Sequence, residues 1–144
     1  MKILVLNGPN MNLLGLREPE IYGRETYEDL VSLAEQTCRE AGLECICVQS
    51  NHEGVLIDEI QKARDGCGGI VINPAGYSHT SIAIADALRA VDLPAVEVHI
   101  SDPEKREPYR HISYTGMACR KVIKGKGLAV YREAILYLKE LAEK

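Results

Sequence analysis

Arg17 and Tyr22 are the most informative pair of potentially catalytic residues in this chain. A tyrosine titrates near 10, so it acts as a base at neutral pH only where its phenolate is stabilised. Lowering its pKa by two units requires roughly 2.7 kcal/mol of differential interaction. Because a nearby guanidinium can supply an interaction of that size, the pair predicts a general base that removes a proton from a bound molecule.

Four further polar residues are candidates to complete such a site. Asn10 and Asn73 are neutral hydrogen-bond donors, and His79 and His99 are candidate acids. With Tyr22 as base, this set suits removal of a proton next to a carbonyl group, followed by loss of a leaving group. The reaction needs neither a metal nor a redox cofactor, and we expect none.

The elements that must position these residues alternate along the chain between apolar runs and amphipathic segments. Strands are predicted at residues 2–7, 43–49, 69–73, 95–99 and 120–124. Helices are predicted at residues 26–41, with Thr26 as the cap, and at 54–65, 79–91 and 128–143. Five strands joined by crossovers predict an α/β fold, a doubly wound parallel sheet in a single domain over residues 1–144.

Polar residues gather where the predicted strands end. They are Asn7 and Asn10, the run 50–53, the run 73–81, and Glu97, His99 and Ser101. The carboxyl ends of parallel strands meet at one edge of a sheet, where ligands bind. Two long connections, residues 8–25 and 101–119, lie at the same edge, and the first is a candidate lid.

Two of these clusters contain local signals of their own. Ser78 or Thr80 is expected to cap the third helix, which would leave His79 in its first turn, where the helix dipole disfavours a protonated imidazole. Ser101-Asp102-Pro103 predicts a short helix, capped by Asp102, whose start forms a cradle for a carboxylate or phosphate. Arg106 and Arg110 are expected on one face of that helix.

Composition narrows the class of protein. The chain has 144 residues and a net charge of -4, which argues against binding nucleic acid and favours small-molecule partners. No apolar run approaches the roughly 18 residues of a membrane span, and no signal peptide is recognisable, so we expect a cytoplasmic protein.

Five cysteines show neither zinc-site nor disulfide spacing, and Cys45 and Cys47 are expected on one face of a strand.

Several motifs resemble, in order and spacing, those of the type II 3-dehydroquinate dehydratases, and the match extends over essentially the whole chain. The matching segments are Leu6 to Gly15, Arg17-Glu18-Pro19 with Tyr22-Gly23, Gln49 to Gly54, Asn73-Pro74 with Ser78 to Ser81, Glu97 to Ser101, and Arg110-His111 with Ser113.

The resemblance implies a flavodoxin-like fold and a reversible, cofactor-free dehydration of 3-dehydroquinate to 3-dehydroshikimate, by anti elimination through an enolate. In that family the residue matching Tyr22 removes the C2 proton, helped by the one matching Arg17. The residue matching Asn10 helps to hold a water that stabilises the enolate. The histidine matching His99 protonates the departing C1 hydroxyl, and Glu97 would orient it.

The resemblance also implies how the substrate is held and how copies assemble. Family members are typically dodecamers built from trimers, so a homo-oligomer is expected, and the residue matching Asp86 reaches the substrate from a neighbouring subunit. Substrate hydroxyls and carboxylate would be held by Asn73, His79, the Ile100 backbone, Ser101 and Arg110.

The chain departs from the family pattern at four places. Asp102 stands where an asparagine is usual, Ala85 where an arginine is common, Ala75-Gly76 reverses the more frequent order, and Pro108-Tyr109 replaces a more usual acidic-aromatic pair. None of these changes removes a catalytic group. An aspartate near the substrate carboxylate would repel it unless it caps its own helix, so Asp102 bears on affinity more than on activity.

Functions of other classes were weighed against the same residues. A flavodoxin-type cofactor carrier needs a hydroxyl-rich phosphate loop after the first strand, where Asn7-Gly8-Pro9-Asn10 stands. A response-regulator receiver needs acidic residues where Asn7 and Asn73 stand. A metal-dependent hydrolase built on His79, Glu97 and His99 lacks a complete ligand set. A non-catalytic flavodoxin-like module that binds a carboxylate is the alternative to the dehydratase.

Overall fold

The computed structural model describes residues 1–16, 20 and 23–144 of the chain. Its centre is a five-stranded sheet in the order β2-β1-β3-β4-β5, and every neighbouring pair is parallel. This order is that of the flavodoxin-like folds, so the predicted fold class is confirmed. The strands are β1 (Lys2–Asn7), β2 (Glu44–Gln49), β3 (Gly69–Asn73), β4 (Ala95–His99) and β5 (Lys121–Lys124).

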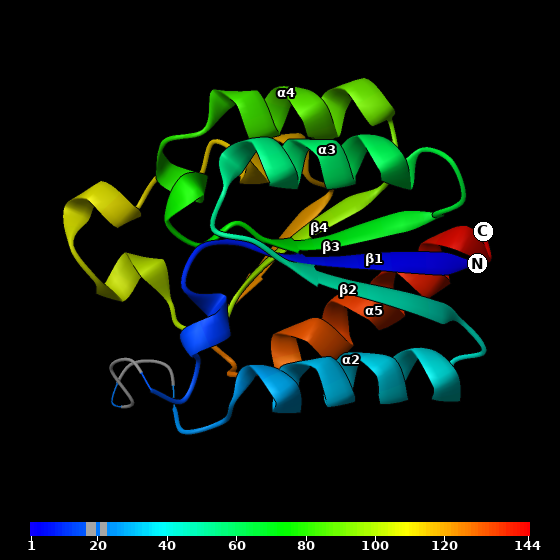
Figure 1. Cartoon of the computed structure of the whole chain (residues 1–144), viewed down its shortest axis with the longest axis horizontal. Coiled ribbons are helices and arrows are strands. Elements are labelled where there is room, and N and C mark those ends of the chain that lie inside the picture. The colour runs from blue at the N-terminus through cyan, green and yellow to red at the C-terminus, as the bar shows by residue number, and fades with distance from the viewer. Residues whose placement is uncertain (17–19, 21–22) are drawn as a thin grey trace.

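Helices cover both faces of the sheet, as Figure 1 shows. α2 and α5 pack on one face, α3 and α4 on the other. The helices are α2 (Tyr27–Glu40), α3 (Glu53–Ala63), α4 (Ile82–Val91) and α5 (Ala129–Ala142). Thr26 caps α2 in a reciprocal arrangement with Asp29, in agreement with the sequence signal.

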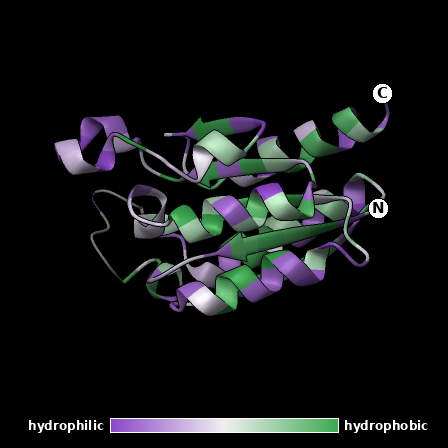
Figure 2. Cartoon of the chain, turned by 90° about the horizontal axis from the view of Figure 1, so that it is seen from above, coloured by the Kyte–Doolittle hydropathy of each residue, from purple (hydrophilic) through white to green (hydrophobic). Residues whose placement is uncertain are grey.

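Successive side chains of the central strands point to opposite faces of the sheet and so contribute to two hydrophobic cores. Ile3 and Val5 of β1 point to the side of α2 and α5, whereas Leu4 and Leu6 point to α3 and α4. All four side chains are almost completely buried. Figure 2 shows a strand that is hydrophobic along most of its length beside helices banded in hydrophobic and hydrophilic colours, the pattern of a parallel sheet covered on both faces.

The connections at the carboxyl edge of the sheet are wound into short 3-10 turns. Within the described residues, four of these turns lie at the end of the molecule opposite both termini (Figure 1). They are η1 (Met11–Leu13), η2 (Ala75–His79), η3 (Pro103–Lys105) and η4 (Pro108–Arg110). A fifth turn, η5 (Gly116–Ala118), packs beside α4 and leads back to the start of β5. The long connection at 101–119 is therefore a series of ordered turns rather than one irregular loop.

Two local expectations were wrong. Helix α4 begins at Ile82 and not at residue 79, because Ser81, rather than Ser78 or Thr80, accepts from the Ile84 amide at 2.9 Å. His79 ends the separate turn η2, so the helix-dipole argument does not apply to it. Arg106 and Arg110 share no helical face, because the extended backbone at Arg106 separates η3 from η4.

Candidate active site

A pocket lies at the carboxyl edge of the sheet, where the sequence predicted it. It brings together seven predicted residues from the ends of β1, β3 and β4 and from η4. These are Asn10, Asn73, His79, His99, Ile100, Ser101 and Arg110. Pro9, Met11, Ala75, Gly76, Pro103 and Arg106 complete the lining. The segments are far apart in the sequence, and the parallel sheet is what brings them to one place.

The first loop reaches the pocket through a close approach of two backbones. A Cβ atom on Gly8 would lie 2.6 Å from the Pro74 carbonyl oxygen, so only glycine fits there. The Gly8 amide donates to the Asn73 carbonyl at 2.8 Å. Asn10 follows in the left-handed region, with φ of 70°, a conformation that asparagine tolerates better than most residues. The backbone N–H of Asn10 donates to Asn51 Oδ1 at 3.0 Å.

A buried acid and a histidine form the back wall of the site. His99 Nε2 lies 2.7 Å from Oε2 of Glu97, whose side chain is fully buried. Burial acts to raise the pKa of Glu97, but the hydrogen bond and charge of His99 and the hydroxyls of Ser113 and Thr115 outweigh it and hold this pKa below its usual value. An ionised Glu97 only accepts, so Nε2 of His99 donates and Nδ1 is left for a ligand.

His79 is held by a backbone carbonyl from across the pocket rim. Its Nδ1 lies 2.8 Å from the Ile112 carbonyl oxygen. Because a carbonyl can only accept, Nδ1 carries a proton and the neutral ring keeps Nε2 as an acceptor. A long-range hydrogen bond, and not a helix terminus, therefore decides which ring nitrogen of His79 carries a proton.

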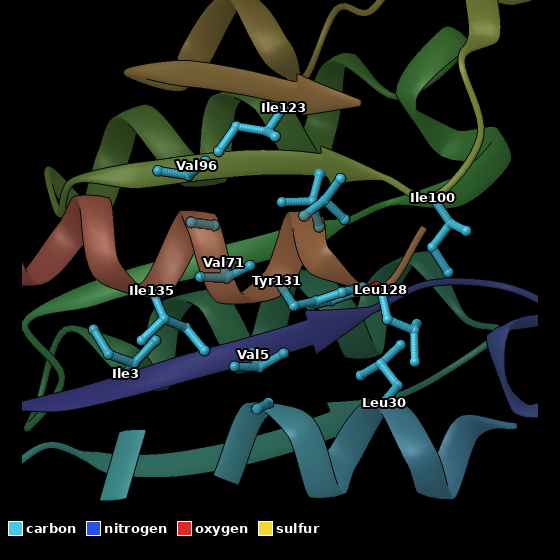
Figure 3. Packing of buried hydrophobic residues seen from close by; sticks show 14 of the residues in the cluster. Ile3, Val5, Leu30, Val71, Val96, Ile100, Ile123, Leu128, Tyr131 and Ile135 are labelled. Atoms are coloured by element: carbon cyan, nitrogen blue, oxygen red, sulfur yellow. The ribbon is translucent and has the colours of Figure 1, made fainter. Parts of the chain in front are cut away.

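Asn73 belongs to a buried hydrogen-bond chain beneath the pocket. Its Nδ2 donates to the Tyr131 hydroxyl at 3.0 Å, and that hydroxyl donates to Asn7 Oδ1 at 2.6 Å. Asn73 Oδ1 accepts from the Ala75 amide at 3.1 Å. Figure 3 shows Tyr131 within the core that joins α5 to the sheet. The chain of bonds fixes the Asn73 amide plane, so a ligand meets a preset donor.

The part of the pocket rim that follows β4 carries two arginines and the predicted cradle for an anion. Arg110 Nε donates to Glu107 Oε2 at 2.7 Å. Asp102 caps η3, as predicted, by accepting from the Glu104 amide at 3.0 Å. The carboxylate of Asp102 is therefore engaged by its own turn. Ser101, Arg106 and Arg110 line the pocket beside it.

Four predicted residues do not line the described pocket. Glu97 does not line the pocket but lies behind His99. Asp86 lies on α4 with its side chain 70% exposed, 3.8 Å from Arg89, away from the pocket of its own chain. Arg17 and Tyr22 lie outside the described residues.

Two supporting groups were missed by sequence reasoning. Tyr131 had been assigned only to the closing helix, and Thr115 only to a long connection. No local signal marks either residue, because each acts on a partner that is distant in the sequence. Arg106 had been noted as a possible cation, and its place in the pocket lining supports that reading.

Two negative findings apply to residues 1–16, 20 and 23–144. They contain no group of three or more His, Cys, Asp or Glu side chains arranged to hold a metal ion. None of the helices in this part of the chain has both the length and the apolar character needed to cross a bilayer.

Known proteins match this chain along nearly its whole length. The family model for dehydroquinase class II matches residues 1–139. A 3-dehydroquinate dehydratase of Corynebacterium glutamicum is 54% identical over 140 residues, 97% of each chain. A type II dehydroquinase structure from Butyrivibrio crossotus superposes with a TM-score of 0.94 at 52% identity, covering 96% of this chain and 97% of that one.

A second structure extends the comparison. The type II dehydroquinase of Propionibacterium acnes has a TM-score of 0.90 at 43% identity and covers 99% of this chain and 97% of its own. Sequence and backbone therefore agree over the same residues, including the strand ends that form the pocket. The chain belongs to the class II dehydroquinase family.

Proposed function

We propose that this protein is a type II 3-dehydroquinate dehydratase, a hydro-lyase that converts 3-dehydroquinate reversibly to 3-dehydroshikimate. The observation that carries the proposal is the buried Glu97–His99 pair behind a pocket lined by Asn10, His79 and Arg110. Such a pocket offers an acid, neutral donors and cationic groups to a small carboxylate with several hydroxyls. The reaction itself is inferred from the family to which the chain belongs.

The acid half of the elimination is assigned to His99. Glu97 accepts from Nε2, so the acid is the doubly protonated imidazolium of His99, which gives its Nδ1 proton to the C1 hydroxyl of the substrate and becomes neutral. As the C1–O bond breaks, the electron pair of the enolate forms the C1–C2 double bond, and the hydroxyl leaves as water. The lost atoms are one proton from C2 and the hydroxyl of C1.

The base half is assigned to Tyr22, with Arg17 holding its phenolate form. Both roles are inferred from the family resemblance, since these two residues lie outside the described part of the chain. The C2 proton is next to the C3 ketone, so its removal gives an enolate whose charge rests on oxygen. Asn10, which lines the pocket, is assigned to help hold a water that donates to that oxygen.

The remaining lining residues are assigned to binding. Ser101 and the Ile100 backbone, with Arg110 and Arg106 across the rim, would receive the carboxylate. His79 offers Nε2 to a substrate hydroxyl. Asn73 Nδ2 has a second hydrogen that Tyr131 does not use. In this structure Nδ2 donates it to the weak acceptor Met11 Sδ at 3.7 Å, and a substrate oxygen would replace that acceptor.

Assembly and location complete the proposal. We propose a homo-oligomer, a dodecamer built from trimers, in which Asp86 reaches the site of a neighbouring copy. The exposed position of Asp86, away from its own pocket, supports this assignment. We also propose that the enzyme acts in the cytoplasm as a single catalytic domain over residues 1–144, without a cofactor.

The test is to incubate the purified, metal-stripped protein with 3-dehydroquinate and follow the ultraviolet absorbance of the conjugated enone. The expected result is a rise that is absent in His99→Ala and unaffected by added metal or nucleotide. Tight binding of 3-dehydroquinate with no enone would refute the dehydratase and favour a carboxylate-binding module.

A further inference from the structure

We propose that Ser113 and Thr115 are positioning residues of the active site, which hold the Glu97 carboxylate ionised and fixed so that it orients His99. The inference rests on the proposed dehydratase function, because it assigns a task within that same site. Neither hydroxyl lines the pocket, so neither is expected to touch the substrate.

Each oxygen of Glu97 receives a hydroxyl donor from the turn-rich connection after β4. Ser113 Oγ donates to Oε2 at 2.5 Å, and Thr115 Oγ1 donates to Oε1. His99 Nε2 also lies 2.7 Å from Oε2. Glu97 and Thr115 are both completely buried, so water does not compete for these bonds. Three donors around one buried carboxyl group are satisfied together when that group is ionised and only accepts.

The backbone fixes the direction of the Ser113 hydroxyl. The Gly116 amide donates to Ser113 Oγ at 2.9 Å, which occupies an acceptor site and leaves the hydroxyl hydrogen for Glu97. A Cβ atom on Gly116 would lie 2.9 Å from Ser113 Oγ and 3.2 Å from Glu97 Oε2. Glycine at this position therefore lets the turn η5 approach the carboxylate closely.

The two hydroxyls matter to catalysis because burial alone would favour a protonated Glu97. Their hydrogen bonds, with those of His99, are what hold the pKa of Glu97 below its usual value. A protonated carboxyl can itself donate, so it no longer dictates that Nε2 of His99 is the donor. Loss of the hydroxyls should then misalign His99 at acid pH first.

The test compares Thr115→Val, which keeps the shape and removes the hydroxyl, with Thr115→Ser, which keeps the hydroxyl. In Thr115→Val, kcat for 3-dehydroquinate should fall roughly tenfold while KM changes by less than about twofold. The acid limb of kcat should move to higher pH by about one unit, because Glu97 protonates more readily. Thr115→Ser should restore both quantities. Wild-type kcat and an unshifted acid limb in Thr115→Val would overturn the inference.

An infrared titration of the carboxyl band, assigned with Glu97→Gln, gives a readout independent of turnover. The band of Glu97 should titrate at higher pH in Thr115→Val than in the wild type, and an unchanged titration overturns the inference. If Thr115→Val does not fold, Ser113→Ala tests the other carboxylate oxygen by the same two measurements. A wild-type protein that forms no enone refutes the proposed function instead, and the infrared result still decides whether the hydroxyls hold Glu97 ionised.

Discussion

Tyr131→Phe removes one hydroxyl from a completely buried hydrogen-bond chain. That hydroxyl donates to Asn7 Oδ1 at 2.6 Å and accepts from Asn73 Nδ2 at 3.0 Å, and the residue is completely buried. Burial also raises the pKa of Tyr131, so the group acts as a neutral donor and acceptor. The variant keeps the ring and its packing but leaves one buried acceptor and one buried donor without their partner.

The expected loss of stability follows from those two bonds. An unsatisfied buried polar group costs about 1–3 kcal/mol, so two of them give a decrease of about 2–6 kcal/mol in the free energy of unfolding. With a urea m-value of about 2 kcal/mol/M, the midpoint should fall by roughly 1–3 M. The Asn73 amide also loses its anchor, so KM for 3-dehydroquinate should rise.

The assay is urea unfolding followed by circular dichroism at several protein concentrations, since subunit association adds to apparent stability. Tyr137→Phe is the matched control, because it makes the same change at a half-buried position on the same helix. The free energy of unfolding of Tyr137→Phe should stay within about 0.5 kcal/mol of the wild-type value. Equal midpoints for Tyr131→Phe and Tyr137→Phe would refute the idea that the hydroxyl holds the two asparagines.

Three other predictions test the remaining assignments. Tyr22→Phe should abolish enone formation in the absorbance assay while calorimetry still detects binding of 3-dehydroquinate, and full turnover would exclude Tyr22 as the base. Gly8→Ala should lower stability by about 1–3 kcal/mol and reduce turnover, because its Cβ meets the Pro74 carbonyl at 2.6 Å. Gly54→Ala, whose Cβ meets nothing within 4 Å, should leave turnover unchanged, and equal melting losses in both glycine variants would contradict this steric argument. The lowered pKa of Glu97 contributes stability that is complete above the unfolded-state pKa of about 4.3 and is lost as pH falls through the folded-state value. Acid unfolding of the wild type should thus be steeper than that of Glu97→Gln, and parallel curves would argue against an ionised Glu97.

Much of the fold was predictable because its signals are local. Runs such as residues 3–6 and 70–72 are short, apolar and bounded by polar residues, which is typical of strands buried on both faces. Thr26 and Asp102 were predicted as caps and act as caps. The helix start near His79 was wrong because Ser78, Thr80 and Ser81 are all acceptable caps by residue type. Only the packing of η2 and the bond from Ser81 to Glu53 at 2.5 Å distinguish them.

By itself, the sequence determined the alternation of strands and helices and hence the edge at which the site lies. It also supplied the residue types, since asparagines, histidines and an acid follow the strands in the order that the family requires. These features follow from periodicity and from the rule that parallel strands end at one edge, neither of which needs coordinates.

The tertiary structure alone decided which groups support the site. Tyr131 bonds to Asn7 across 124 positions, and Thr115 bonds to Glu97 across 18. No periodicity or cap signal encodes such pairs, because each depends on how α5 and the turn-rich connection pack against the sheet. The candidate reactive residues can therefore be predicted from the sequence, whereas the groups that support them are determined by contacts that form only when the chain is folded.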